Sequence, residues 1–190
     1  MAQSSFYSEE ELATLGLKSY GKNVLISRKA SIYGASNIEI GDNVRIDDFC
    51  TLSISKSLKI GSYIHIGCYA SIIGAGEIVL SDFCGLSGRV SIYSSSDDYS
   101  GNSLTNPMVD EKFTNVTSAP VILGKHVIVG CGTAIMPGVT IGEGASIGAM
   151  SLVLEDCKSN WIYSGNPLKR IIPKSTKYKE LEVEFLNYKK

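Results

Sequence analysis

Two adjacent acids, Asp97 and Asp98, open a polar stretch that interrupts an otherwise regular pattern of aliphatic residues. The stretch reads SSSDDYSGNSLTNPMVDEKFTNVT, from Ser94 to Thr117. A carboxylate can accept a proton from a reacting group, which is general base catalysis. The common alternative is that an acid at the entrance of a loop forms an Asx turn or caps a backbone N–H. On the residues alone both uses stay open.

The loop that begins with these acids, 97–117, is too long for a simple connection. Loops of this length without secondary structure are usually either functional or disordered. Its apolar residues are Tyr99, Leu104, Met108, Val109 and Phe113. Because they can anchor the segment, we expect a folded functional loop, with Tyr99 as a candidate contact for a substrate.

Few other residues have the chemistry of a metal or redox site. The histidines, His65 and His126, are far apart in the repeat pattern, so we predict no metal site. The five cysteines show no CxxC spacing and are Cys50, Cys68, Cys84, Cys131 and Cys157. Their odd number, together with an N-terminal stretch that lacks the pattern of a secretion signal, favours reduced cysteines in a cytoplasmic protein.

The composition narrows the class of protein. The chain has 190 residues, with 18 Lys plus Arg and 19 Asp plus Glu, which gives a net charge of −1. This length favours a single domain, 1–190. The charge balance argues against a nucleic-acid-binding protein, which normally has a basic excess. No apolar run approaches the ~20 residues that a membrane span needs, so no membrane span is expected.

The elements that must position these residues follow from an internal repeat. IGDNVRIDDFCTL from Ile40 aligns with segments that start at Ile60 and Leu80, which is a 20-residue period. After the loop the period is 18, since Leu123 repeats as Ile141. Within each coil the pattern divides into units of six, too short for helices and rich in β-branched residues. Short strands and tight turns, three per coil, predict a three-sided parallel β-solenoid.

Both ends of the chain are predicted to form helices, on either side of coils over 24–155. Ser8 and Glu11 form a capping box that predicts an N-terminal helix over 8–16. A tail over 156–173 precedes a C-terminal helix over 175–190, whose aromatic and aliphatic residues recur on one face. We expect this second helix to pack against the end of the solenoid or against a neighbouring subunit.

The stretch PGVTIGEGASIGAMSLVLED, followed by IYSGNPLKRI, resembles the hexapeptide-repeat acyltransferases. The resemblance covers roughly residues 24–173. It implies an all-β, left-handed parallel β-helix with an extended active-site loop. The handedness rests on the resemblance, because a parallel crossover is right-handed by default. The family also implies a homotrimer with acyl-CoA, such as acetyl-CoA, bound between subunits.

The resemblance assigns the coenzyme groove to small residues and nearby cations. The groove residues are Gly130, Cys131, Ala149 and Ser151, with Lys169 in the GNPLKR turn for the phosphates. Two departures from the family are Ile128, where members often have an aromatic residue, and Glu155, where a basic residue is usual. Arg170 or Lys174 is expected to replace the missing cation.

The same resemblance bears on catalysis. Relatives that acetylate hydroxyl groups carry a histidine where this chain has Asp97, with Asp98 as the alternative if the alignment slips by one residue. An amine whose ammonium has shed its proton attacks a thioester unaided, so a carboxylate suffices to take the proton from the adduct afterwards. Ser87, in the coil beneath the loop, is a candidate to hydrogen-bond the acceptor or the thioester. His65 is a candidate for the substrate groove one coil earlier, although a solvated histidine is the simpler interpretation.

The motifs KNVLISRKASIY, NVRIDDFC and DDYSGN are similar to those of N-acyltransferases of nucleotide-linked 4-amino-4,6-dideoxy sugars, a group that includes a dTDP-sugar enzyme. The resemblance therefore implies transfer of an acyl group, acetyl by default, to the amine of a nucleotide-linked sugar for surface polysaccharide. The alternatives are O-acetylation of a sugar hydroxyl and a non-catalytic solenoid that serves as a binding module.

Overall fold

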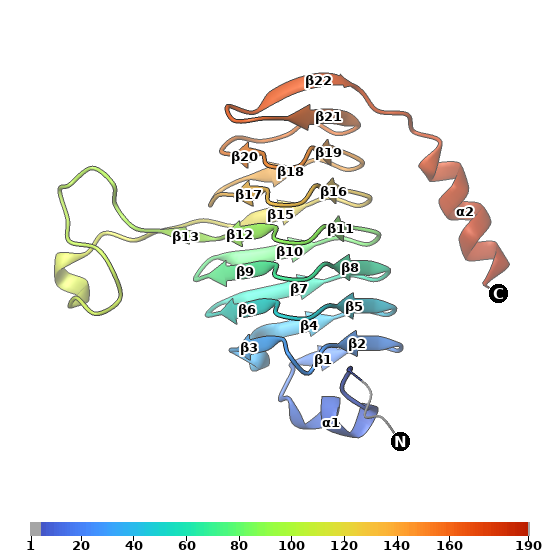
Figure 1. Ribbon diagram of the computed structural model, residues 1–190, viewed down its shortest axis with the longest axis horizontal. Helices are drawn as coiled ribbons and strands as arrows, with labels where there is room; N and C mark the ends of the chain where they lie inside the picture. The colour runs from blue at the N-terminus through green and yellow to red at the C-terminus, as the bar shows by residue number, and fades with distance from the viewer. Residues whose placement is uncertain (1–4, 190) are drawn as a thin grey trace.

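A computed structural model describes residues 5–189 and shows a three-sided parallel β-solenoid with one projecting loop and two helices (Figure 1). The first face contains β1 (Ser19–Tyr20), β4 (Ile38–Ile40), β7 (Ser57–Ile60), β10 (Glu77–Leu80), β15 (Val121–Leu123) and β18 (Thr140–Ile141). The second contains β2 (Val24–Ile26), β5 (Val44–Ile46), β8 (Ile64–Ile66), β11 (Gly85–Leu86), β16 (Ile128–Val129), β19 (Ser146–Ile147), β21 (Trp161–Ser164) and β22 (Lys169–Pro173). The third contains β3 (Ser31–Tyr33), β6 (Thr51–Ile54), β9 (Ser71–Gly74), β12 (Ser91–Tyr93), β17 (Ala134–Ile135) and β20 (Leu152–Val153). The predicted parallel solenoid is confirmed.

The core is a set of aliphatic stacks that follow the sequence period. Ile40 pairs with Ile60, Ile60 with Leu80, and Leu80 with Leu123, and all four side chains are buried. Alternate strand residues point inward, so each coil buries its aliphatic positions on those of the next coil. Burying a side chain of this size contributes about 1.5–3 kcal/mol. The coils extend beyond the expected 24–155, because β1 and β21 pair with the repeat at its two ends.

The faces meet at three edges, which we call the first edge (between the first and second faces), the second edge (between the second and third) and the third edge (between the third and first). The turns of the first and second edges repeat a left-handed backbone conformation. At the first edge φ is positive at Asn23, Asn43, Tyr63, Phe83, His126, Gly144 and Asn160. At the second edge it is positive at Phe49, Tyr69, Arg89, Gly132 and Met150. The third edge holds the short helix η1 (Ala35–Asn37) and releases the loop.

The N-terminal helix α1 (Glu9–Thr14) lies at the base of the solenoid (Figure 1). The predicted capping box is present: Ser8 Oγ accepts from the Glu11 backbone N–H at 3.3 Å, and Glu11 Oε2 accepts from the Ser8 backbone N–H at 2.7 Å. The helix is shorter than the expected 8–16, and its Leu12 is buried against the first coils.

The C-terminal helix α2 (Tyr178–Tyr188) packs along the first edge of its own chain. Phe185 lies edge-on to the stacked rings of Tyr63 and Phe83, and Tyr178 contacts His126. The helix therefore packs along the coils of its own chain and not on the solenoid end, while Leu181 and Tyr188 of its apolar face remain 51% and 87% exposed. The expected contact with a neighbouring subunit stays a prediction. The end of the solenoid is closed instead by β22, which runs antiparallel to β21. Ser175 does not cap the helix directly, since its hydroxyl accepts from the N–H of Lys177, the residue before α2.

A charge cluster fixes α2 to the first edge. The carboxylate of Glu182 bonds the ammonium of Lys125 and, at 2.7 Å, Nε2 of His126. His126 is therefore a packed residue, 12% exposed. The hydrogen bond from Lys125 is the main cause that holds the pKa of Glu182 below its usual range, and His126 adds to it.

We expect the helix attachment to weaken in acid. Glu182 has a lower pKa in the folded protein than in the unfolded chain, where it is about 4.3. Its contribution to stability is therefore complete above that unfolded value and is lost as the pH falls through the folded value. Glu182→Gln should lower the free energy of unfolding by about 1–2 kcal/mol at neutral pH and less in acid. Thermal unfolding of both proteins between about pH 7 and 3 measures this. Glu184→Gln, an exposed change on the same helix, should show no such trend.

The loop is held at its base by an antiparallel ribbon of β13 (Ser95–Ser96) and β14 (Thr117–Ser118). Beyond the ribbon it projects from the third edge and contains the short helix η2 (Glu111–Phe113) (Figure 1). Leu104 pairs with Thr114 across the loop, and the backbone N–H of Leu104 donates to Phe113 O at 2.8 Å. The segment is therefore folded, but by backbone hydrogen bonds. The expected anchoring by apolar residues is not seen in the single chain, since Tyr99 and Met108 are 90% and 91% exposed.

Candidate active site

The two acids at the base of the loop have different surroundings. Asp98 forms an Asx turn, because its Oδ1 accepts from the Ser100 backbone N–H at 2.8 Å and its Oδ2 from the Ser100 hydroxyl at 2.9 Å. These bonds, the backbone one first, hold the pKa of Asp98 below its usual range. Within residues 5–189 no hydrogen bond or ion pair engages the Asp97 carboxylate. Asp98 therefore shapes the loop, and Asp97 is the acid that is available to a ligand.

Asp97 lines a hollow of about 400 Å³ at the third edge. The hollow is bounded by Tyr93, Ser95, Ser96, Tyr99, Val116 and Met136. Tyr99 is 90% exposed, so its ring is presented to whatever approaches the loop rather than packed under it. The hollow is open on this side of the chain and leaves Asp97 accessible.

Ser87 lies at the second edge, directly after β11. Its backbone N–H donates to Val129 O at 2.9 Å, which leaves the side chain at the surface of the turn. The strand β12 crosses the third face between Ser87 and the loop, a width of about 10 Å. One chain therefore places Ser87 and Asp97 on opposite edges of the same face and does not bring them together.

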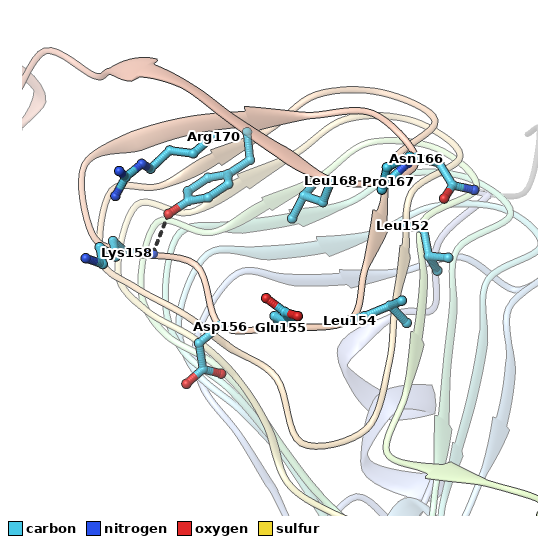
Figure 2. A pocket seen from close by; sticks show the side chains of 10 residues that line it. Leu152, Leu154, Glu155, Asp156, Lys158, Asn166, Pro167, Leu168 and Arg170 are labelled. Atoms are coloured by element: carbon cyan, nitrogen blue, oxygen red, sulfur yellow. Dashed lines mark hydrogen bonds between the residues drawn. The ribbon is translucent and has the colours of Figure 1, made fainter.

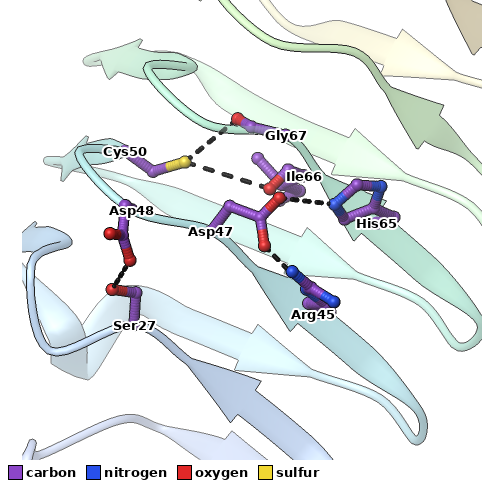
Figure 3. A network of polar contacts seen from close by, with 8 residues as sticks. All are labelled: Ser27, Arg45, Asp47, Asp48, Cys50, His65, Ile66 and Gly67. Atoms are coloured by element: carbon purple, nitrogen blue, oxygen red, sulfur yellow. Dashed lines mark hydrogen bonds and ion pairs between the residues drawn. The ribbon is translucent and has the colours of Figure 1, made fainter. Parts of the chain in front are cut away.

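The His65 side chain is 55% exposed, as the simpler interpretation of the sequence predicts, and a neighbouring acid orients its ring (Figure 3). Its Nε2 lies 2.8 Å from Oδ2 of Asp47, whose Oδ1 accepts from Nε of Arg45 at 2.7 Å. Partial burial opposes ionisation of Asp47, but the hydrogen bonds from His65 and Arg45 outweigh it and hold its pKa below the usual value. The His65 ring is thus held on the second face, one coil below Gly85 and close to the edge that carries Ser87.

The residues assigned to the coenzyme by resemblance lie at the second edge, in the coils above Ser87. Gly130 must be glycine, because a Cβ there would lie 2.4 Å from the backbone N of Ala149 in the next turn. Cys131 and Ala149 are exposed. Ser151 is buried, and its hydroxyl donates to Gly148 O at 2.7 Å and accepts from the Gly165 N–H at 3.0 Å. Its hydroxyl is therefore used inside the turn, which leaves the first three residues to line the surface.

The three cations expected near the coenzyme do not lie together. Lys169 is exposed at the start of β22, opposite Ser164, on the side of the second edge. Arg170 turns over the end of the solenoid, with its guanidinium carbon 4.3 Å from the centre of the Trp161 ring. Lys174 lies at the first edge beside Tyr178, where burial lowers the pKa of its ammonium group. Only Lys169 is placed next to the proposed groove.

A cavity of about 410 Å³ lies at the C-terminal end of the coils (Figure 2). It is lined by Leu152, Leu154, Glu155, Asp156, Lys158, Tyr163, Asn166, Pro167, Leu168 and Arg170. The Tyr163 hydroxyl accepts from the backbone N–H of Lys158 at 2.7 Å and closes one wall. The sequence indicated Arg170 as a candidate cation for the coenzyme and Glu155 as a departure from the family. It did not predict a cavity, because the cavity depends on how β22 folds back over the last coil.

The buried cysteines offer no alternative nucleophile. Burial raises the pKa of the Cys50 thiol to about 11, and that of Cys84 to about 12, so neither is a nucleophile at neutral pH. Within residues 5–189 no group of three or more His, Cys, Asp or Glu side chains is arranged to hold a metal ion. No helix in this range is long and apolar enough to cross a membrane.

Comparison with known proteins places the chain in a family. The model of the bacterial transferase hexapeptide (six repeats) matches residues 120–155. The dTDP-4-amino-4,6-dideoxy-D-glucose acyltransferase of Escherichia coli is 50% identical over 182 residues, which cover 95% of each chain. The chain belongs to the hexapeptide-repeat acyltransferases. The predicted family is thereby confirmed.

Solved structures agree with this assignment. A serine-to-cysteine variant of AntD, an N-acyltransferase from Bacillus cereus, in complex with dTDP-4-amino-4,6-dideoxyglucose and coenzyme A matches with a TM-score of 0.94 at 47% identity, over 98% of this chain and 100% of that one. Its complex with dTDP and 3-hydroxybutyryl-CoA gives a TM-score of 0.94 at 48% identity, over 98% of both chains. A galactoside acetyltransferase in complex with coenzyme A shares the fold, with a TM-score of 0.59 at 21% identity, covering 90% of this chain and 74% of that one.

Proposed function

We propose that this hexapeptide-repeat acyltransferase transfers an acyl group from acyl-CoA to the amine of a nucleotide-linked amino-deoxy sugar used in surface polysaccharide synthesis. The observation that carries the proposal is the unengaged Asp97 carboxylate at the base of the loop, where relatives that acetylate hydroxyl groups have a histidine. The 50% identity to a dTDP-amino-sugar acyltransferase supports the same acceptor class. We also propose a cytoplasmic location for the enzyme.

The reaction follows from the chemistry of an amine and a thioester. The nitrogen lone pair attacks the carbonyl carbon, and the tetrahedral adduct carries an extra proton on nitrogen. Asp97 accepts this proton, the C–S bond breaks, and coenzyme A leaves as the thiolate, which is then protonated. Once the ammonium group has lost its proton to water, the free amine attacks without a base, so a carboxylate suffices to take the second proton from the adduct. Ser87 donates a hydrogen bond to the carbonyl oxygen or to the sugar.

The separation of Ser87 and Asp97 supports a homotrimer with its sites between subunits. A loop that leaves the third edge of one chain can reach the second edge of a neighbour, so each site combines Asp97 of one chain with Ser87 of the next. The first edge is covered by α2 and is the least available for this contact. Closed cyclic symmetry is the usual form of such assemblies.

The solved variants of AntD support the same pair of residues. They change one serine and one aspartate that are ten positions apart in that chain. Ser87 and Asp97 are also ten positions apart, at the end of one coil turn and at the base of the loop. We also assign to His65, which Asp47 holds one coil below them, a contact with the sugar.

The experiment that tests the function is an assay of acyl-CoA consumption with a panel of acceptors. We expect turnover with dTDP-linked 4-amino-4,6-dideoxyglucose, and none with the corresponding 4-hydroxy sugar or with the free amino sugar. Acetyl-CoA and 3-hydroxybutyryl-CoA should be compared as donors, since the solved relative binds the second. Turnover of the hydroxy sugar would favour O-acetylation, and no ligand-dependent activity would favour a binding module.

Lys169→Ala should weaken the binding of acyl-CoA without slowing the chemical step. Lys169 is the exposed cation beside the groove, so its loss should raise the KM for acyl-CoA by about 5- to 10-fold and leave kcat nearly unchanged. The difference should shrink at high salt, because an exposed ion contact is screened over about 10 Å at 0.1 M ionic strength. Lys174→Ala, at the opposite edge, is the matched control. An unchanged KM for acyl-CoA in the first variant would assign the phosphates to other residues.

A further inference from the structure

The two ends of the solenoid are finished differently. At the N-terminal end α1 lies at the base of the coils, and its Leu12 is buried there, with 3% of the residue exposed (Figure 1). At the C-terminal end β22 closes the second face, while β18 and β20 are the last strands of the other two faces. The cavity of about 410 Å³ lies beside β22 at this end (Figure 2). Residues 5–189 therefore cover the C-terminal end only in part.

Apolar side chains are left at this end. Leu154 is 62% exposed beside the cavity, and Ile171 and Ile172 of β22 are 51% and 54% exposed. Leu152 and Leu168 line the cavity and are only half-buried. A repeat that ends a solenoid normally has a polar outer face, because it has no further coil to pack on. Apolar residues framed by charged ones indicate an interaction surface.

The charges around the cavity have both signs and are separated along the last coil. Glu155 and Asp156, which we call the end acids, lie at the third edge, directly after β20. Lys158 and Arg170, which we call the end cations, lie toward the first edge, Arg170 over the ring of Trp161. Within residues 5–189 the Glu155 carboxylate and the Lys158 ammonium have no ion-pair or hydrogen-bond partner. These charges are therefore available to a partner.

This arrangement is complementary to itself. A two-fold axis that is perpendicular to the solenoid and passes through the middle of the first face exchanges the first and third edges. The end acids of one copy then lie over the end cations of the other. The same axis exchanges the second and third faces, so Leu154 of one copy lies over β22 of the other. A two-fold contact of this kind is closed, because each copy uses the same surface.

The ends of the solenoid disfavour two other modes of assembly. A head-to-tail contact needs a free N-terminal end, and α1 covers that end. Strand pairing along the outer edge of β22 is opposed by Lys169, Arg170 and Pro173, since charged residues and proline protect an edge strand. A contact between two C-terminal ends is therefore made by side chains.

We propose that the C-terminal end of the solenoid binds the C-terminal end of a second copy of this chain. The end acids of each copy pair with the end cations of the other, around an apolar centre that contains Leu154 and the isoleucines of β22. The contact goes beyond the proposed reaction and does not depend on it, because Ser87 and Asp97 lie several coils below this end.

The contact joins two of the proposed trimers into a hexamer. Ser87 and Asp97 belong to the same coil, so the chains of such a trimer lie side by side with their C-terminal ends at one level. Two trimers then meet through three identical contacts. Each contact needs only about a third of the ~1,200–2,000 Å² that a specific interface buries.

Sedimentation velocity measures this contact directly. At about 10 µM chain we expect a species with twice the mass of the basic assembly, six chains where that assembly is a trimer. It should dissociate on dilution and at high salt, because the charge pairs are screened. Glu155→Lys places like charges across the axis and should raise the dissociation constant by about 100-fold. Leu154→Asp, which puts a charge into the apolar centre, should raise it by at least about 10-fold.

A charge exchange distinguishes pairing between copies from a local effect. Lys158→Glu alone should prevent the doubling as Glu155→Lys does, and the double variant should restore it, because opposite charges again face each other. Glu184→Lys and Val183→Asp on the exposed side of α2 are the matched controls and should keep the doubled mass. All these side chains are exposed, so every variant should keep the thermal midpoint of the unmodified protein.

Three outcomes would overturn the inference. The first is an unmodified protein that shows only the basic assembly at every concentration. The second is a doubled mass that persists in both Glu155→Lys and Leu154→Asp, because another surface then forms it. The third is a Glu155→Lys protein in which only the affinity for coenzyme A changes, because the cavity then belongs to the coenzyme site. The proposed function is tested separately by the acceptor assay and stands or falls independently of these results.

Discussion

Replacing Asp97 with asparagine is expected to lower the turnover number by about 10²–10⁴, the range typical of a lost general base. Asparagine has the same shape and still donates and accepts hydrogen bonds, so the KM values of both substrates should change little. The carboxylate is exposed and has no hydrogen-bond partner within residues 5–189, so its replacement should not disturb the loop. Stopped assays of coenzyme A release at saturating substrates measure the effect.

Asp98→Asn is the matched control at the adjacent position. Asp98 holds the Asx turn with Ser100, and asparagine can keep the bond from the backbone N–H. We therefore expect a kcat within about threefold of the unmodified enzyme. A full rate in Asp97→Asn beside a severe loss in Asp98→Asn would transfer the role to Asp98. Full rates in both variants would mean that the proton leaves through water or through the substrate.

The second large effect is expected when two inactive variants are assembled together. Ser87→Trp fills the turn at the second edge, and Asp97→Asn removes the base, so each variant alone should retain only residual activity. If every site combines the second edge of one chain with the loop of another, co-expression should produce trimers in which about a quarter of the sites carry both normal residues. The specific activity should therefore recover to about a quarter of that of the unmodified enzyme.

The control is to mix the two variants after each has been assembled separately, where slow subunit exchange should keep the activity low. Recovery only on co-expression would show that the site is shared between chains. If co-expression restores nothing while trimers of mixed composition are present, the two residues act within one chain, and the arrangement proposed for the trimer is wrong.

The sequence predicted the coils well because the repeat itself specifies the pairing. A period of 20 places Ile40 beside Ile60 and Ile60 beside Leu80, and the structure has this register. It did not predict where α2 packs, because the apolar face of a helix does not identify its receptor. The available signal was the first edge, where the turn residue changes from Asn43 to Tyr63 and Phe83 as the period advances.

The candidate site was also predictable in part from the repeat. The loop interrupts the repeat, so its position and the acids at its base were evident. The choice between Asp97 and Asp98 was not, because it depends on which carboxylate meets Ser100. His65 read as a solvated residue because its partner, Asp47, lies one coil earlier and is adjacent only in the folded solenoid.

The ribbon at the base of the loop has an evolutionary consequence. Ser94 and Ala119, which flank it, are joined by a hydrogen bond from the Ala119 N–H to Ser94 O at 3.0 Å, and the Ser94 hydroxyl is fixed to Gly76. The coil is thus sealed beneath the insertion, whatever the insertion contains. The loop can therefore be lengthened, shortened or replaced in evolution without shifting the register of any coil. New acceptor preferences can therefore arise by exchange of the loop alone, while the buried aliphatic residues of the coils stay unchanged.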